Sequence, residues 1–274
     1  MNSTESTTKP ASFPTAKMLG ILLVVSLISL NLFILIRIKT VEAQFSKQQA
    51  FWTLCQEVSS ATQRAAFFTS LVAEQHSEWR SANLRNLDLE GSNLANRNLS
   101  MADFTGTKFV KTDLTQAMLK ASRLDLCDCS SANFEDSVLD EVQLFKSRID
   151  NANFRSATMV SAVLEQCSGD NVNFVRANLT GALLSMANLS NADFTGANLS
   201  GASLEGATLQ GANLALAEFK DTNITDVDFT GANWWRSQGL SRDQLHFLAD
   251  TFPATETDKE NRQRDFKLWL QGFQ

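Results

Sequence analysis

The 274-residue sequence contains little of the side-chain chemistry on which most enzymes depend. It has two histidines, His76 and His246, which lie far apart and outside the repetitive part of the chain. It contains no G-x-x-x-x-G-K-[ST] phosphate loop, no H-E-x-x-H zinc motif and no G-x-S-x-G nucleophile motif. We therefore predict that the protein is not an enzyme and that it uses no cofactor.

Positive charge is also in short supply. The chain carries 24 Lys and Arg against 30 Asp and Glu, and residues 81–235 alone carry 11 against 19. Proteins bind nucleic acid mainly by neutralising its phosphates, so an acidic segment of this length repels DNA and RNA. The charge balance therefore argues against direct nucleic-acid binding.

What the sequence does contain is a period of five residues. From Leu84 to Trp234, every fifth residue belongs to a central column of 31 units, and only Cys129 and Gly169 depart from a large apolar side chain. This period matches neither the 3.6-residue helix nor the two-residue alternation of a strand. A short, fixed period is typical of a solenoid, in which each unit buries its apolar residue only by stacking on its neighbours.

The columns beside the central one sharpen this interpretation. A small residue lies two positions before most centres, Asn or Asp often lies one position before, and Ser, Thr or Gly often follows, as in residues 192–196 (ADFTG) and 197–201 (ANLSG). This pattern resembles the pentapeptide-repeat family over about 155 of the 274 residues. The resemblance implies an all-β solenoid, namely a right-handed quadrilateral β-helix with four repeats per coil, over residues 81–235.

A coil of four repeats stacks residues that lie twenty positions apart. One face then carries an aromatic ladder of Phe134, Phe154, Phe174 and Phe194, and the small residues at 129 and 169 on the adjacent face offset its volume. The column before these phenylalanines is mostly Asn, which we expect to hydrogen-bond between coils or to cap its own turns. Neutral Asn is a poor ligand for a hard divalent cation, so we predict no metal site.

The cysteines are predicted to be small apolar fillers. Cys127, Cys129 and Cys167 fall at inward positions of the coil, whereas Cys55 precedes the repeats. Cys127 and Cys167 occupy one column two coils apart, which is about 9.6 Å along the axis. That separation exceeds the roughly 7 Å between Cα atoms that a disulfide can bridge. We therefore predict no disulfide.

The N-terminal part of the chain indicates a membrane anchor. Residues 1–16 are predicted to be a disordered tail, and an uncharged apolar run at 18–36 predicts a transmembrane helix over 17–39. A signal peptide cleaved near Ala43 is the alternative, although the run is long for one, and Arg37 and Lys39 separate it from that site. Basic residues flank both ends, so the side of the membrane that carries the repeats stays open. The prediction is a single-pass membrane protein.

Helical segments are predicted to close both ends of the solenoid, because an open β-helix end exposes unpaired edges. Residues 40–80 contain no Gly or Pro and predict a helical linker and N-terminal cap. Residues 236–274 predict a C-terminal helical cap. Within it, Ser241 and Gln244 resemble a capping box that opens a helix to about Asp250, and a last helix follows over 257–270.

The middle coils place apolar residues at outward positions on two adjacent faces. These residues are Met118, Val138, Phe145, Val160, Val163 and Leu183. A contiguous exposed apolar surface can mark an interaction site, whereas scattered single apolar residues are normal. We predict that these six residues form a partner surface.

Together these features predict a non-enzymatic, membrane-tethered scaffold or interaction rod that presents flat β-helix faces to a protein partner. The family resemblance supplies one alternative, an acidic rod that mimics duplex DNA and binds a type II topoisomerase. A regulatory module for a partner enzyme is the other alternative. A homodimer is left open.

Overall fold

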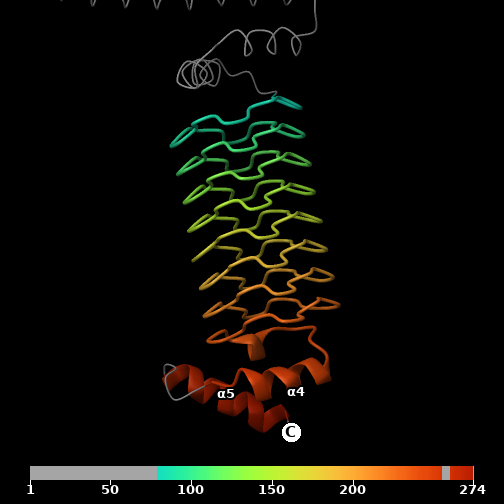
Figure 1. Ribbon diagram of the computed structural model, residues 1–274. Coiled ribbons are helices and arrows are strands. Elements are labelled where there is room, and N and C mark those ends of the chain that lie inside the picture. Colours follow the sequence, from blue (N-terminus) through green and yellow to red (C-terminus); the bar gives the residue numbers. More distant parts are fainter. Residues whose placement is uncertain (1–78, 255–259, 274) are drawn as a thin grey trace, which may run out of the picture. The chain divides into compact units, whose positions relative to one another are not determined.

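The computed structural model describes residues 79–254 and 260–273, and these form a β-solenoid followed by short helical elements (Figure 1). The helical elements are the 3-10 turn η1 (Trp234–Arg236), helix α4 (Arg242–Thr251) and helix α5 (Glu260–Phe273). The predicted tail at 1–16, the predicted membrane helix at 17–39 and the predicted linker up to residue 78 lie outside the described residues. Within residues 79–254 and 260–273, no helix has the length and apolar character needed to cross a membrane.

Each coil of the solenoid contains four repeats, as the sequence predicted. Parallel bridges join residues twenty positions apart, for example Gln143 to Val163 and Met118 to Val138. The amide of Leu144 donates to the carbonyl of Val163 in the next coil at 2.7 Å, while the amide of Gln143 donates to Ser122 in the preceding coil at 3.0 Å. Backbone hydrogen bonds therefore run from coil to coil along the stack, as in a parallel sheet.

The coil has four faces, which we number by their central residues. Face 1 is centred on Leu84, Phe104, Leu124, Leu144, Leu164, Leu184, Leu204 and Ile224. Face 2 is centred on Leu89, Phe109, Cys129, Ile149, Gly169, Leu189, Leu209 and Phe229. Face 3 is centred on Leu94, Leu114, Phe134, Phe154, Phe174, Phe194, Leu214 and Trp234, and face 4 on Trp79, Leu99, Leu119, Leu139, Met159, Leu179, Leu199 and Phe219.

The core of the solenoid is the stack of these central side chains. The aromatic ladder on face 3 is present, with ring centroids 4.7, 5.2 and 4.9 Å apart from Phe134 through Phe194 and interplanar angles of 15° or less. At Gly169, an added Cβ would lie 2.7 Å from Ile149 Cγ1 and 2.8 Å from Val172 Cγ2. The side chains of its neighbours therefore occupy the space that Gly169 leaves, in keeping with a closely packed interior.

Polar residues in the inward column of small residues have their hydroxyl groups satisfied by the backbone. The buried hydroxyls of Thr107, Thr112 and Thr222 each donate to a carbonyl in the preceding coil at 2.7 Å. Ser147 donates to Leu124 in the same manner. A buried hydroxyl is costly only when it lacks a partner, so these positions accept Thr and Ser as well as Ala.

The corners of the coil impose a backbone restriction that the sequence obeys. Residues at the second position after each centre have φ near +60°, from 54° to 61° for the non-glycine corners. None of these described corner residues is Val, Ile or Thr. Branched side chains are disfavoured in the left-handed region, which explains why the sequence places Asn, Asp, Ser and Gly at many corners.

The solenoid begins earlier than the repeat count suggested. Trp79 already occupies a central position, and its amide donates to the carbonyl of Asn98 in the next coil at 2.8 Å. At the other end, Gln238 still pairs with Glu218. The coil pairing thus covers residues 79–238, slightly more than the predicted 81–235.

The C-terminal helices pack on the last coil through an aromatic cluster. The ring of Trp234 lies 5.8 Å from Phe266 and 5.2 Å from Trp269, both in α5. The carboxylate of Asp265 accepts hydrogen bonds from Trp235 Nε1 at 2.7 Å and from Arg236 Nη2 at 2.6 Å. The predicted capping box is present, because Ser241 Oγ accepts from the amide of Gln244 at 3.2 Å and Gln244 Oε1 accepts from the amide of Ser241 at 2.8 Å.

Candidate interaction surface

The six predicted surface residues lie on faces 4 and 1, which meet at one edge of the coil. Met118 and Val138 are bridge partners in adjacent coils of face 4, and Val163 and Leu183 are bridge partners on face 1. Val160 follows the centre of its repeat on face 4, and Phe145 follows the centre of its repeat on face 1. The register therefore brings the six residues onto two neighbouring faces, as predicted.

Their exposure divides the six into two groups. Met118 and Leu183 are exposed, with 43% and 41% of their surface accessible. The side chains of Val138, Phe145, Val160 and Val163 are half-buried between outward neighbours. The surface thus consists of four half-buried apolar side chains and two exposed ones. That it binds a partner stays a prediction.

Three further apolar residues at the corners that border face 1 were missed by the sequence analysis: Met101, 53% exposed, at the edge shared with face 4, and two at the edge shared with face 2. Leu126 and Met186 occupy corner positions and are 59% and 68% exposed. Both have φ of 59°. The corner column was interpreted only as a column of turn residues. A large apolar side chain in that column was the signal that could have revealed them.

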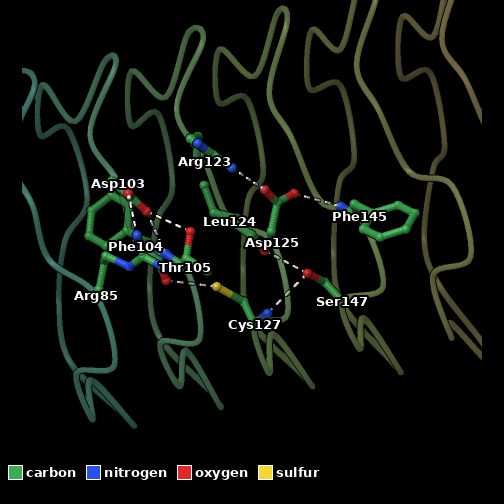
Figure 2. A network of polar contacts seen from close by, with 10 residues as sticks. All are labelled: Arg85, Asp103, Phe104, Thr105, Arg123, Leu124, Asp125, Cys127, Phe145 and Ser147. Atoms are coloured by element: carbon green, nitrogen blue, oxygen red, sulfur yellow. Dashed lines mark hydrogen bonds and ion pairs between the residues drawn. The ribbon is translucent and has the colours of Figure 1, made fainter.

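Part-buried and exposed polar contacts position residues of this surface (Figure 2). One oxygen of Asp125 accepts from the amide of Phe145 in the next coil at 3.1 Å, and the other accepts from Arg123 at 3.2 Å. On face 4, Asp140 accepts from the amide of Val160 at 3.0 Å. The ammonium group of Lys146 lies 5.1 Å from the centre of the Phe145 ring. Phe145 and Val160 are therefore positioned by carboxylates of the preceding coil.

Another carboxylate of face 1 is also tied into the coil. Burial alone would raise the pKa of Asp103, but hydrogen bonds from the Thr105 hydroxyl and amide, with the charges of Arg85 and Arg123, outweigh it and lower the pKa. The Thr105 hydroxyl donates to Asp103 at 2.6 Å (Figure 2). This carboxylate is ionised near neutral pH and engaged locally.

Charge is sparse on the two faces from the coil of Val160 and Val163 onward, whereas the repeats that carry Met118 and Val138 also contain Lys120, Asp140 and Glu141. On face 4, residues 157–161, 177–181 and 197–201 contain no charged side chain. On face 1, residues 162–166, 182–186 and 202–206 contain only Glu165 and Glu205. Around Val160, Val163 and Leu183, the scarcity of charge together with apolar side chains matches the composition of an interface core.

The described cysteines lie outside these faces, in the interior of the coil. Burial raises the pKa of the Cys167 thiol to about 12. A hydrogen bond with Cys127, together with burial, raises the pKa of Cys129 well above its ordinary value. Cys127, Cys129 and Cys167 are free, buried thiols. Within residues 79–254 and 260–273, no cluster of His, Cys, Asp and Glu could hold a metal ion.

A shallow, open cleft lies beside α4. Its volume is about 320 Å³, and it is lined by Asp226, Val227, Asp228, Phe247 and Phe252. Small-molecule sites normally enclose most of their ligand. The shape of this cleft therefore suits surface contact better than capture of a substrate.

Comparison with known proteins gives a family match and several structural similarities. Eight copies of the family model described as Pentapeptide repeats match residues 82–120, 127–166, 147–185, 173–211 and 197–233. Full-length QnrB1, a plasmid-mediated fluoroquinolone resistance protein, aligns with 21% identity over 62% of this chain and 90% of its own, with a TM-score of 0.30. HetL, a pentapeptide repeat protein involved in heterocyst differentiation regulation from Nostoc sp. strain PCC 7120, aligns with 24% identity over 63% of this chain and 97% of its own, with a TM-score of 0.29. No curated protein matches the chain significantly.

Proposed function

The chain belongs to the pentapeptide-repeat family, and from this premise we propose that it is a non-enzymatic, membrane-tethered scaffold whose flat β-helix faces bind a protein partner. The observation that carries the proposal is the run of outward apolar side chains on faces 4 and 1, with few charges from the coil of Val160 and Val163 onward. Met118 and Leu183 project from it, and Val138, Val160 and Val163 fill the space between.

The construction of the faces supports a protein as the ligand. On each face of an inner coil, the amide of the central residue and the carbonyl of the residue before it hydrogen-bond to neighbouring coils, so a partner contacts mainly side chains. A flat arrangement of such side chains suits an extended protein surface, because small molecules need a concave site to bury most of their area. The acidic balance of the repeats disfavours nucleic acid.

A DNA-like surface for a topoisomerase is less well supported. Duplex mimicry requires negative charge spread along the rod, yet fifteen residues of face 4 in three consecutive coils carry no charge. Several carboxylates on other faces are neutralised, such as Asp128 by Arg148 and Asp88 by Lys108. These pairs reduce the negative field that would attract a DNA-binding enzyme.

The membrane tether in this proposal rests on the apolar run at residues 18–36. Fusing alkaline phosphatase or a fluorescent protein after Gln274 tests it in a bacterial host. Phosphatase activity alone would place the repeats outside the cytoplasm, and fluorescence alone would place them inside. Release of the full-length fusion into the soluble fraction would contradict the tether.

Site-specific photo-crosslinking tests the interaction surface. A photoreactive amino acid is placed at Met118 on face 4 in the full-length chain, and at Ser168 on face 2 as a matched exposed control. We expect a crosslink to a different protein from position 118 and none from position 168. Equal crosslinking from both positions, or none from position 118, would contradict the proposed surface.

A further inference from the structure

One corner column on the rim of face 1 is arranged symmetrically along the rod. Read from the first coil to the last, this column is Asn86, Gly106, Leu126, Lys146, Gln166, Met186, Gly206 and Asp226. Residues at equal distances from the midpoint between Lys146 and Gln166 are alike. The innermost pair is long and polar, the next pair is long and apolar, the third pair is glycine, and the outermost pair is Asn and Asp. All eight share positive φ, so they occupy equivalent places in their coils.

The two apolar members of this column are unfavourable in an isolated rod. Their φ of 59° is easiest for glycine, and the same corner is glycine one coil before Leu126 and one coil after Met186. Both side chains are also largely in water, at 59% and 68% exposure. Neither backbone preference nor burial within the chain accounts for a large apolar residue here. The same is true of Met101 and Leu216, so it is the symmetric placement of Leu126 and Met186 in one column that points to a surface covering them.

We propose that face 1 packs against face 1 of a second copy of this chain, with the two rods antiparallel. The two-fold axis lies in the plane of the contact, parallel to face 1 and perpendicular to the rod axis, at the level midway between Lys146 and Gln166. Rotation about this axis reverses the order of the coils and leaves each column opposite itself. Leu126 of one copy then lies opposite Met186 of the other, and each interaction occurs twice, as an isologous interface requires.

The charges of face 1 fit this arrangement. Lys146 faces Gln166 of the second copy and lies beside its Glu165, which supplies an opposite charge. Arg123 faces Leu183, and Asp125 faces Ser185. No like-charged residues oppose each other along the described length of the face. An overall acidic rod can therefore approach its own copy through this face without close repulsion.

A parallel arrangement of the two rods fits less well. A two-fold axis along the rod keeps coils level with their copies and exchanges the two sides of face 1. It would set Met186 opposite the glycine corner at Gly181 and Leu126 opposite Ala121. Neither Leu126 nor Met186 would then meet a large apolar side chain, so the antiparallel register is the one that the corner side chains favour.

The expected dimer is weak. Eight coils spaced by about 4.8 Å, with a flat face roughly 10 Å wide, give a contact of about 400 Å² per copy. This is below the roughly 800 Å² per partner of a standard interface, so we expect a dissociation constant in the micromolar range. This dimer rests on the proposed interaction role: a second copy of the chain binds face 1. Met118, Val138 and Val160 on face 4 remain accessible to a different protein.

A first experiment compares self-association of full-length variants in mild detergent by sedimentation over a concentration series. Met186→Gly relieves the backbone at its corner, so it should unfold at the same or higher denaturant concentration while its dimer dissociates at least about tenfold more readily. Leu216→Gly is the matched control, because Leu216 is also an exposed corner residue, with φ of 61° and 62% exposure, but lies on another edge. A chain that is monomeric throughout, or equal effects of both variants, would overturn the proposal.

A second experiment tests the register by disulfide trapping in a full-length Cys55→Ser background, in which the remaining cysteines are buried. Chains with Leu126→Cys and chains with Met186→Cys carry different tags and are mixed before oxidation. We expect a mixed disulfide dimer and no dimer from either variant alone. Dimers from Leu126→Cys alone, or from Met186→Cys alone, would show a register other than the proposed one and overturn the proposal. The disulfide-linked dimer contains only this chain. Failure to form it would therefore contradict the dimer, whereas a missing photo-crosslink at Met118 would contradict the binding of a different protein.

Discussion

Replacing Phe154 with Ala tests the aromatic ladder that fills face 3. Phe154 is fully buried and stacks on Phe134 at 4.7 Å and on Phe174 at 5.2 Å. The matched control is Phe154→Leu, because Leu114 and Leu214 occupy the same column in other coils. The control keeps a large apolar side chain at the centre and removes only the aromatic contacts and a small volume.

The expected magnitude follows from these contacts. Burial of a large apolar side chain stabilises by about 1.5–3 kcal/mol, and each aromatic pair adds about 0.5–1.5 kcal/mol. Losing the burial and both stacked pairs should lower the free energy of unfolding by about 3–5 kcal/mol, in line with measured Phe→Ala changes in cores. For Phe154→Leu we expect a loss of about 1–2 kcal/mol, because most of the volume is retained.

Urea unfolding of the full-length protein, followed by far-ultraviolet circular dichroism, measures both changes. The slope of free energy against urea should stay constant if the whole solenoid unfolds as one unit. A loss below about 1 kcal/mol for Phe154→Ala would mean that this side chain is not enclosed between two rings. The coil of four repeats would then be wrong, since only that register places the three phenylalanines in contact.

Three further predictions concern single contacts. The buried hydroxyl of Thr158 has no hydrogen-bond partner, so Thr158→Val should leave the free energy of unfolding in urea unchanged or raise it by up to about 1 kcal/mol. Thr222→Val removes a 2.7 Å hydrogen bond to a carbonyl and should lower the free energy of unfolding by about 1–2 kcal/mol. Gly169→Ala should destabilise by about 1–3 kcal/mol, because its Cβ would lie 2.8 Å from Val172, and the double variant with Val172→Ala should recover part of the loss in the same assay. The hydrogen-bonded ion pair with Arg236 holds the pKa of Asp265 below its ordinary value of 3.8. The stability that this pair contributes is therefore present above that pH and is lost as the pH falls through the lowered pKa. Tryptophan fluorescence should show a smaller acid-induced change for Asp265→Asn, and an identical pH profile would refute this.

The fold could be predicted from the sequence because its period is unambiguous. Each unit repeats the same small, polar and apolar columns, so the identity of the core and the contact between residues twenty apart follow from counting. The Asn column also behaves as expected, since Asn153 Nδ2 donates to Asn133 Oδ1 at 2.9 Å, and Asn153 Oδ1 accepts from the amide of Arg155 at 3.1 Å. The capping box at Ser241 was equally visible, because it depends on residues three positions apart.

The functional surface was predicted only in part. Met118 and Leu183 were visible because they interrupt the polar outward columns next to the centre. Leu126 and Met186 were missed because their unusual character depends on the φ of the corner, a backbone property that the sequence pattern does not state. Their placement on one edge also depends on which repeats share a face. The sequence therefore predicts the core better than the surface, where several side chains satisfy the same fold.

The rule of four repeats per coil has a consequence for how such a chain can change length. Inserting or deleting twenty residues would slide every later coil along the rod by one rung and leave each downstream side chain on its own face. A change of five residues would instead turn everything downstream by a quarter revolution relative to the upstream coils. Faces 1 and 4 upstream would then continue into different faces downstream, with no core residue lost. A change of a multiple of twenty residues therefore alters only the length of the rod, whereas a change of another multiple of five also rotates the downstream faces relative to the upstream ones.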